Sequence, residues 1–426
     1  MRIATHTLGC KLNYAETSNI VRGFVEAGAK VVDYHEVADL YVVNTCTVTA
    51  IAEKKCRTII RQAHRQNPDA IIAVVGCFAQ NEAQNIANIE GVNIVLGNHE
   101  KQRLQSIVES RVWESDSKRQ YVSSGFDPKS FDLSFSSGDR TRTFFKIQDG
   151  CDYFCTYCAI PIARGRSRSA TIDETIAAAH RIAATGAKEV VLTGINTGTF
   201  GKAHGETFFD LIKALDKVEG ILRYRISSIE PNLITDEIID FVAQSRTFLP
   251  HFHIPLQAGS DKVLRLMHRR YDTALYADKL RYIKQVMPHA CIAADIIAGF
   301  NGEGQQEFDE ACRFVESVPI SYLHIFTYSE RPNTVALRMT EKVPMHERRV
   351  RSRILHELSE RKKEAFYAEH IGETRPVLWE SDNCEGMMMG FTDNYIRLRQ
   401  AYDPTLVNTI TQAAITPENI VHSYEE

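Results

Sequence analysis

The chain has 426 residues, of which 24% are charged, and its formal net charge is −4. This length allows two or three domains, and this charge balance excludes a protein that binds nucleic acid through its overall charge alone. The longest apolar runs, such as 70–75, are no longer than a strand. The sequence therefore predicts no signal peptide, no membrane span and a cytoplasmic location.

Near the start of the chain, three predicted strands each lead to a cysteine. Strand-like runs precede these cysteines at 3–8 before Cys10, at 40–45 before Cys46, and at 70–75 before Cys77. Helical patterns follow, one from Asn13 with Glu16 as an Asn-x-x-Glu cap, and one over 49–66. Parallel strands of an open α/β sheet deliver their carboxyl ends to one edge, so the three thiols are expected to converge. They would then hold a cluster with one open iron; the alternative is three buried free cysteines, since cysteine is often interior.

A second group of cysteines follows a polar stretch. Residues 113–140 are rich in Ser, Asp and Arg and form the predicted linker after an N-terminal domain at 1–112. Cys151, Cys155 and Cys158 then stand in the spacing Cys-x3-Cys-x2-Cys. A structural zinc site needs four ligands, whereas three thiolates leave one iron of a 4Fe–4S cluster open to a substrate. The alternative is a zinc loop whose fourth ligand is distant, such as His180 or Cys291.

Ten cysteines in an otherwise ordinary composition are better explained by metal ligation than by disulfides. The remaining four are predicted to be packing or bystander residues: Cys56, Cys291, Cys312 and Cys384.

Beyond the linker, strand-like and helical runs alternate, and Thr171 with Glu174 predicts a capping box. The predicted strands are 143–147, 189–194, 222–227, 251–254, 291–297 and 321–326. The predicted helices are 172–184, 207–219, 234–244, 260–287 and 304–317. Six strands alternating with helices indicate parallel βα units in a partial (β/α)6 barrel over 141–368. Reactive groups of such barrels lie at the carboxyl ends of the strands, where the cysteine loop leaves the first strand.

The last part of the chain gives mixed indications about a partner. Residues 331–363 contain ten Lys or Arg against four Glu, which suits phosphate contacts; the alternative is a solvated helix face at 345–368. Residues 369–426 alternate in short stretches, such as 375–380 and 395–398, and predict a small all-β barrel. Three Arg and nine acidic residues from 370 onward weigh against a strong grip on RNA by this tail.

Taken together, these motifs resemble the radical S-adenosylmethionine (SAM) methylthiotransferases over essentially the whole chain. The matching segments are Leu8–Asn13, Asn44–Cys46, Val75–Cys77, Gly150–Cys158, Arg164–Arg168, Leu192–Asn196, Arg225–Pro231, His253–Gln257 and Asp295–Phe300. The two cysteine triads in this order are the most specific part of the match. The resemblance implies an N-terminal cluster domain, a radical-SAM core and a C-terminal TRAM-like domain.

The resemblance also implies two [4Fe-4S] clusters and SAM. Cys10, Cys46 and Cys77 would ligate an auxiliary cluster that carries the sulfur to be inserted. Cys151, Cys155 and Cys158 would ligate the cluster that cleaves SAM to a radical. Residues at the predicted mouth of the barrel are candidate SAM contacts, although each also fits a turn: Thr193, Gly194, Asn196, Ser228, Glu230 and Gln257.

The implied reaction converts a C–H bond of a modified adenosine in the tRNA anticodon stem-loop to C–SCH3. Lys11-Leu12 resembles the branch acting on N6-threonylcarbamoyladenosine-37, whose carboxylate would suit Arg164 or Arg331. The alternatives are N6-isopentenyladenosine-37, a ribosomal-protein aspartate, and a non-enzymatic iron–sulfur protein that binds RNA or senses redox state. The electron donor and the sulfur source remain unidentified partners.

Overall fold

The computed structural model describes residues 1–47, 50–115, 120–123, 130–138 and 141–422. These residues form two compact units. The first comprises 1–136, 144–170 and 329–337, and the second comprises 137–143, 171–328 and 338–426. None of the described helices is long and apolar enough to cross a membrane. The domain bounds expected at 112, 141 and 369 stay predictions.

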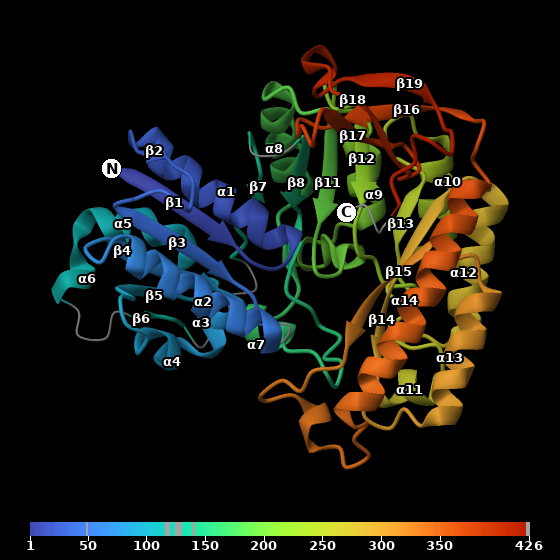
Figure 1. The fold of residues 1–426 in the computed structure, drawn as a ribbon, viewed down its shortest axis with the longest axis horizontal. Helices are drawn as coiled ribbons and strands as arrows, with labels where there is room; N and C mark the ends of the chain where they lie inside the picture. Colours follow the sequence, from blue (N-terminus) through green and yellow to red (C-terminus); the bar gives the residue numbers. More distant parts are fainter. Residues whose placement is uncertain (48–49, 116–119, 124–129, 139–140, 423–426) are drawn as a thin grey trace. The chain divides into compact units, whose positions relative to one another are not determined.

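The first unit is built on a parallel six-stranded sheet with helices on both faces (Figure 1). Its strands, in spatial order, are β2 (Lys30–Val31), β1 (Arg2–Thr7), β3 (Leu40–Thr45), β4 (Ile71–Gly76), β5 (Ile94–Leu96) and β6 (Gln120–Tyr121). One face is covered by α1 (Lys11–Glu26) and α5 (Leu104–Ser110). The other is covered by α2 (Ala50–Gln66), α3 (Cys77–Asn81) and α4 (Ala83–Ala87). Burial on both faces explains the continuous apolar run of β3.

The three predicted N-terminal strands are confirmed, but the predicted cap of the first helix is wrong. Helix α1 begins at Lys11, and Cys10 occupies its N-cap position without a side-chain hydrogen bond. Asn13 and Glu16 instead lie inside the helix and are fully buried. Residue 49, the predicted start of α2, and residues 116–119, 124–129 and 139–140 of the predicted linker lie outside the described residues.

Short elements complete the first unit. They are a 3-10 turn (Lys101–Arg103), α6 (Val112–Ser115), β7 (Ser134–Phe135), β9 (Gln148–Asp149), α7 (Ile160–Arg164) and β10 (Arg168–Ser169). Strand β8 (Arg142–Lys146) is divided between the two units. Strands β9 and β10 pair antiparallel, Asp149 with Arg168 and Gln148 with Ser169. The two ends of the cysteine loop are therefore held together by this strand pair.

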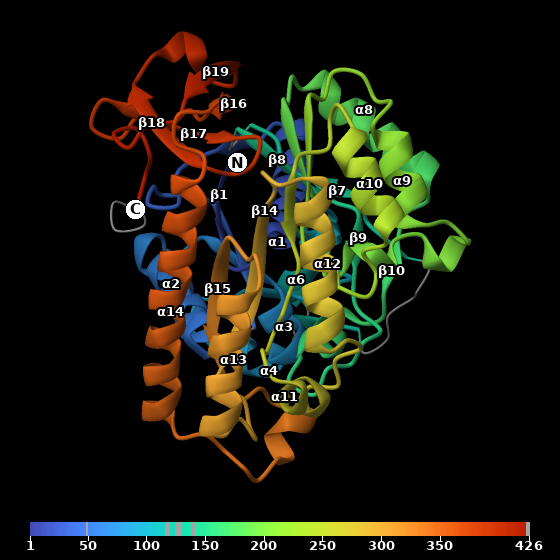
Figure 2. The ribbon, with the colours of Figure 1, turned by 90° about the vertical axis from the view of Figure 1, so that its right-hand side faces the viewer.

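The second unit contains parallel strands, each followed by a helix (Figure 1). Its strands are β11 (Glu189–Thr193), β12 (Arg223–Ile226), β13 (His251–His253), β14 (Cys291–Ala298) and β15 (Tyr322–Thr327). Its helices are α8 (Ile172–Ala184), α9 (Phe208–Leu215), α10 (Asp236–Gln244), α11 (Asp261–Leu266), α12 (Thr273–Val286), α13 (Gln305–Ser317) and α14 (Met345–Ala368). Figure 2 shows α12, α13 and α14 side by side along β14 and β15. Two 3-10 turns (Thr197–Thr199 and Lys202–His204) follow β11, and a third (Val335–Arg338) precedes α14.

The alternation predicted for this part of the chain is confirmed, with one error. The capping box of Thr171 and Glu174 starts α8 as predicted. The single helix predicted over 260–287 is instead two helices, α11 and α12. His268 adopts a left-handed conformation, with φ of +58°, and Asp272 caps α12 by accepting a hydrogen bond from the Leu275 amide at 2.8 Å.

The C-terminal residues form an antiparallel sheet, which confirms the predicted all-β tail. Its spatial order is β18 (Arg397–Ala401), β17 (Met387–Thr392), β16 (Thr374–Trp379) and β19 (Ile410–Ala414), with a 3-10 turn at Pro404–Leu406. The strand predicted to begin at Tyr395 begins at Arg397, because Tyr395 is in a turn with φ of +70°. The fold class is therefore α/β, with parallel sheets and a small all-β tail.

Candidate active site

The first unit brings Cys10, Cys46 and Cys77 to one edge of its sheet, as the strand ends predict. These residues follow β1, β3 and β4, which are neighbours in the sheet. Gly9, with φ of +106°, packs so closely that a Cβ there would lie 2.8 Å from Cβ of Cys46 and 3.1 Å from its Sγ. Cys10 and Cys77 are close enough to act on each other electrostatically. Only glycine fits beside this group of thiols.

The second cysteine triad lies in an irregular loop of the same unit. The Cys151 amide donates to the carbonyl of Gly165 at 3.1 Å, and the Cys158 amide donates to the carbonyl of Cys155 at 3.0 Å. Gly150 has φ of +68°, and a Cβ there would collide with the carbonyl of Arg166. Cys155 is buried, whereas Cys151 and Cys158 are partly exposed. Backbone hydrogen bonds therefore shape a loop that presents three thiols.

The described cysteines are not gathered as closely as the ligands of a single metal ion. Tetrahedral zinc with Zn–S bonds of about 2.3 Å requires sulfurs roughly 3.8 Å apart. Among the residues that the structure describes, three potential ligand atoms lie within 4.8 Å of one another only in a group without cysteine. Neither cysteine triad is gathered this tightly, whereas a 4Fe–4S cube holds its three thiolates further apart. The thiolate-only donor set of each triad also fits such a cluster.

Arg164, at the end of α7, connects the cysteine loop to the N-terminal cysteines. Its Nε donates a hydrogen bond to Sγ of Cys77 at 3.2 Å. One terminal nitrogen donates to Oδ1 of Asn13 at 2.6 Å, and that oxygen lies 3.9 Å from Sγ of Cys10. Asn98 approaches Sγ of Cys77 at 3.6 Å and donates to the carbonyl of Ala163 on α7 at 2.7 Å. Residues between the two triads are thus fixed by direct contacts.

A buried network of charged side chains lies beside these cysteines. Its members are at most 5% exposed: Glu16, Lys101, Lys146, Asp149, Arg164 and Arg168. Arg164 donates to Glu16 at 3.0 Å and to Asp149 at 3.1 Å. Four cations against two carboxylates leave an excess of two positive charges. This excess favours an anionic group at the adjoining edge.

The charges of this network persist at neutral pH. Burial alone would raise the pKa of Glu16, but Arg164 and the two lysines lower it below its ordinary value of 4.5. Burial would also raise the pKa of Asp149, and the surrounding cations hold it well below 3.8. Burial lowers the pKa of Lys101 to about 8, although Glu16 opposes this shift. The network is therefore ionised and internally paired.

Sequence reasoning missed most of this network. The pattern Asn13-x-x-Glu16 predicts a helix cap, and Lys101 and Lys146 are isolated lysines without a motif. The available signal was the position of Asp149 and Arg164 on either side of the cysteine loop.

The two arginines suggested as partners for a substrate carboxylate are already engaged. Arg164 is completely buried in the network. Arg331 is 7% exposed, and its NH1 donates to Glu53 at 2.6 Å and to the carbonyl of Thr47 at 3.2 Å. Neither offers a free face to a ligand, so this expectation is wrong.

The six candidate SAM contacts all lie in the second unit, at the ends of β11 and β12 and just after β13. Adjacent loops are joined there: the Thr197 amide donates to the Ser228 carbonyl at 3.1 Å, and the Glu230 amide reaches Oδ1 of Asn196 at 3.5 Å. Thr193 is buried, and Gly194 follows it in the same loop. The structure thus brings Thr193, Gly194, Asn196, Ser228 and Glu230 to one edge.

Several of these side chains have protein partners. Glu230 pairs with Arg269; burial raises the pKa of Glu230, although Arg269 opposes the shift. Ser228 contacts His253, with Oγ 3.3 Å from Nδ1. Gln257 has φ of +64°, and its amide donates to the carbonyl of Asp295 at 2.8 Å. Their role toward SAM stays a prediction.

Some of the basic side chains in the stretch 331–363 are buried rather than exposed. Arg348 is buried and donates to the carbonyls of Val343 and Tyr328. Arg351 is buried and pairs with Glu303 at 3.0 Å. These two cations of α14 stabilise packing and are not available to phosphate.

The four remaining cysteines behave as predicted for packing or bystander residues. Cys56 and Cys291 are buried in hydrophobic clusters, and burial raises their pKa to about 11 and about 12. Cys312 lies on α13, with its pKa raised to about 11 by burial, and Cys384 is exposed.

Comparison with known proteins agrees with this arrangement. Residues 2–97 match the family described as "Uncharacterized protein family UPF0004", and residues 145–315 match the Radical SAM superfamily. The threonylcarbamoyladenosine tRNA methylthiotransferase MtaB of Bacillus subtilis (strain 168) is 39% identical over 409 residues, covering 93% of this chain and 89% of that protein. MtaB of Aquifex aeolicus (strain VF5) is 36% identical over 405 residues, covering 94% and 97%.

More distant similarities include another curated relative and a solved structure. A tRNA-2-methylthio-N(6)-dimethylallyladenosine synthase of Pelotomaculum thermopropionicum (strain DSM 13744 / JCM 10971 / SI) is 30% identical over 426 residues, covering 97% of this chain and 95% of that protein. The radical SAM methyltransferase TsrM of Kitasatospora setae, solved with cobalamin and a [4Fe-4S] cluster, superposes with a TM-score of 0.59 at 13% identity, covering 79% of this chain and 76% of that one. That similarity concerns the fold alone. Identity and coverage among the curated relatives, together with the radical-SAM match, show that this chain belongs to the MtaB-type radical-SAM methylthiotransferases and is a tRNA methylthiotransferase.

Proposed function

We propose that this enzyme places a methylthio group on C2 of N6-threonylcarbamoyladenosine-37 in the anticodon stem-loop of tRNA. The observation that carries the choice of base is the order of identities. Relatives named threonylcarbamoyladenosine tRNA methylthiotransferase reach 39% and 36%, whereas relatives named for the dimethylallyl nucleoside are 30% to 32% identical. A single-stranded loop can present an unstacked adenine to a protein pocket, which suits such a substrate.

We further propose that two [4Fe-4S] clusters are bound. Cys151, Cys155 and Cys158 would hold the one that interacts with SAM, and Cys10, Cys46 and Cys77 would hold the auxiliary one. When bound, these groups supply the one-electron chemistry that opens an unactivated C–H bond and the sulfur that replaces the hydrogen. The protein's own part is to position the thiolates and to surround them with buried positive charge.

Contacts around Arg164 support this division of roles. The guanidinium donates to Cys77 while Glu16 and Asp149 hold it from the other side. The sulfur of Cys77 is therefore oriented by a donor that cannot lose its proton. A side chain at Gly9 would collide with Cys46, and one at Gly150 would collide with the carbonyl of Arg166, so both positions require glycine.

The proposal is tested with purified, anaerobically reconstituted enzyme, SAM, a reductant and synthetic anticodon stem-loops. One stem-loop carries N6-threonylcarbamoyladenosine, and its matched control carries N6-isopentenyladenosine. We expect the 2-methylthio nucleoside from the first RNA and little from the second. Preferential conversion of the isopentenyl RNA would assign this enzyme to the other branch. Conversion of neither RNA would contradict a modified adenosine-37 as the substrate.

A further inference from the structure

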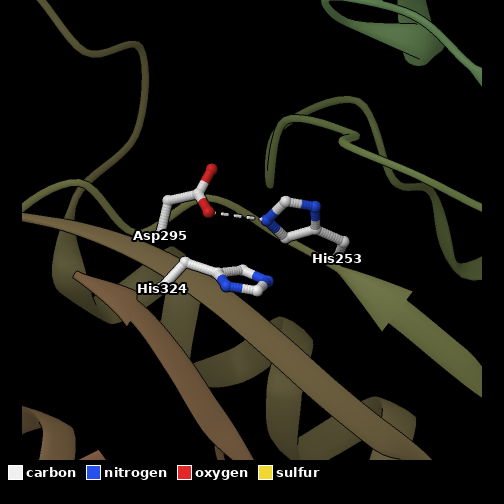
Figure 3. A group of neighbouring side chains, drawn as sticks. All are labelled: His253, Asp295 and His324. Carbon is white, nitrogen blue, oxygen red and sulfur yellow. Dashed lines mark hydrogen bonds and ion pairs between the residues drawn. The ribbon is translucent and has the colours of Figure 1, made fainter. Parts of the chain in front are cut away.

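Outside the cysteine triads, three potential metal ligands gather in the second unit. His253, Asp295 and His324 each offer one ligand atom, and these atoms lie within 4.8 Å of one another (Figure 3). Among the described residues this is the one group of three such side chains so closely spaced.

The sheet itself creates this arrangement. Strands β13, β14 and β15 are parallel neighbours, and each contributes one of the three side chains. Asp295 stands directly opposite His324 in the ladder between β14 and β15. His253 pairs with Ala293, two residues before Asp295 and therefore on the same face of β14. Three adjacent strands thus direct His, Asp and His toward one side of the sheet.

The contacts within the group match those of a metal site. Nε2 of His253 lies 2.8 Å from Oδ1 of Asp295, and the rings of His253 and His324 lie 5.4 Å apart at 69°. Figure 3 shows the His324 ring beside the His253–Asp295 pair. His253 and Asp295 are partly buried, with side chains 16% and 17% exposed. The two atoms of that pair hold a proton or a cation between them.

Ser228 supplies the orienting contact that metal-binding histidines usually have. Its Oγ lies 3.3 Å from Nδ1 of His253, the ring nitrogen turned away from Asp295. A ligating histidine typically donates its second N–H to such an outer partner, which fixes the tautomer and leaves the other nitrogen for the metal. This contact is independent of the spacing of the three ligands and favours the same conclusion.

We propose that His253, Asp295 and His324 bind a divalent transition-metal ion, separate from both cysteine triads. Two imidazoles and one carboxylate are the facial donor set that suits iron(II), manganese(II) and zinc(II). Three protein ligands leave positions open to an oxygen ligand, unlike the closed four-ligand shell of a structural zinc site. This proposal fails separately from the proposed methylthiolation, because its test measures bound metal rather than product.

The test uses anaerobically reconstituted full-length holoenzyme, with manganese(II) as the probe. After incubation with Mn²⁺ and removal of free ion, total iron, manganese and zinc are measured by mass spectrometry. Pulsed EPR then detects nitrogen coupling to bound Mn²⁺. We expect wild type to hold one more divalent ion per chain than His324→Ala and Asp295→Asn, with imidazole nitrogen coupled to Mn²⁺. Asp295→Asn preserves the shape of the side chain, so it remains informative if His324→Ala folds poorly.

Two further variants sharpen the result. Ser228→Ala should weaken Mn²⁺ binding by about 10- to 100-fold, the usual effect of losing an outer-shell partner. His356→Ala, which removes an exposed histidine of α14, should bind Mn²⁺ like wild type. Equal total metal in wild type and both ligand variants would overturn the proposal, as would Mn²⁺ bound without nitrogen coupling.

Discussion

Arg164 Nε donates a hydrogen bond to Sγ of Cys77 at 3.2 Å, although 87 residues separate the two in sequence. The same guanidinium contacts Glu16, Asp149 and Asn13. A planar fork with five donors can serve all of these acceptors at once, and a lysine ammonium cannot. One side chain therefore connects the end of the cysteine loop with the thiols at the sheet edge.

The first prediction concerns stability. Arg164→Lys keeps the charge but leaves some hydrogen bonds of the buried Glu16 and Asp149 carboxylates unmade. We therefore expect the free energy of unfolding to fall by on the order of 3 kcal/mol. Arg166→Lys is the matched control, because the Arg166 side chain is 72% exposed and should matter little. Denaturant unfolding of both holoenzyme variants checks this. Equal unfolding midpoints would contradict a structural role for the Arg164 network.

The second prediction concerns the proposed auxiliary cluster. Hydrogen bonds to cluster sulfurs help to set the reduction potential. A donor to Cys77 stabilises the reduced cluster, which carries more negative charge, and so raises the potential. Arg164→Lys should therefore lower the potential of one of the two clusters, by on the order of 60 mV, which corresponds to about 1.4 kcal/mol for one electron. EPR-monitored redox titration of this variant, wild type and Arg166→Lys measures the change. Unchanged potentials in all three would show that Arg164 only supports packing.

The third prediction distinguishes ligand thiols from bystanders. The buried thiols of Cys56 and Cys291 have raised pKa values of about 11 and about 12. At pH 8, about three pH units or more below these values, both thiols should therefore react slowly with iodoacetamide. Exposed Cys384 should react quickly in holoenzyme and apoenzyme alike. The proposed ligands should become reactive only after the iron is removed, and Cys10, which is exposed but has a raised pKa, should then react more slowly than Cys384. Peptide mass spectrometry reads each site, and rapid labelling of Cys10 in iron-loaded protein would count against its role.

The fourth prediction concerns acid stability. The folded pKa of Glu16 lies below its ordinary value of 4.5, so the stabilisation it contributes is complete above about pH 4.5. As the pH falls through the lowered pKa, the unfolded state binds the proton first and this stabilisation is lost. Glu16→Gln should therefore be less stable at neutral pH, with a shallower loss of stability in acid. Glu26→Gln, an exposed change on the same helix, should lose stability with falling pH as steeply as wild type. The same steepness in Glu16→Gln would show that the network is unimportant.

The fifth prediction concerns iron content. Wild-type enzyme should hold about eight irons, four per cluster. The triple alanine variant of Cys151, Cys155 and Cys158 should keep about half and form no 5′-deoxyadenosine. The triple variant of Cys10, Cys46 and Cys77 should also keep about half, but should still cleave some SAM without methylthio product.

A matched control for iron content comes from the bystander cysteines. The triple alanine variant of Cys56, Cys312 and Cys384 should retain full iron and activity. SAM cleavage without the Cys151 triad would contradict its role, and methylthio product without the Cys10 triad would contradict sulfur delivery at that edge.

Much of this arrangement could be predicted from the sequence because it depends on local pattern. The apolar run of β3 and the glycine–cysteine pair after β4 fix strand ends, and parallel topology then makes the cysteines converge. The capping box at Thr171 is similarly local. The start of helix α1 was predicted wrongly because Asn13-x-x-Glu16 has the pattern of a cap. Both residues are instead buried by tertiary contacts inside the helix.

Contacts between distant residues could not be predicted in this way. Nothing near Lys101 or Lys146 in the sequence indicates that both meet Glu16. The His253, Asp295 and His324 group depends on the register of three strands, which a single sequence does not specify. Left-handed His268 likewise divides a helical pattern that reads as continuous.

The central claim is that this enzyme modifies threonylcarbamoyladenosine in tRNA, and nucleoside mass spectrometry of cellular tRNA tests it most directly. Cells lacking the enzyme are compared with cells expressing wild type or the Cys77→Ala variant, with Cys384→Ala as the control. We predict that 2-methylthio-N6-threonylcarbamoyladenosine disappears without the enzyme, returns with wild type and Cys384→Ala, and stays absent with Cys77→Ala. Its persistence in cells lacking the enzyme, or selective loss of the methylthio-isopentenyl nucleoside instead, would contradict the account.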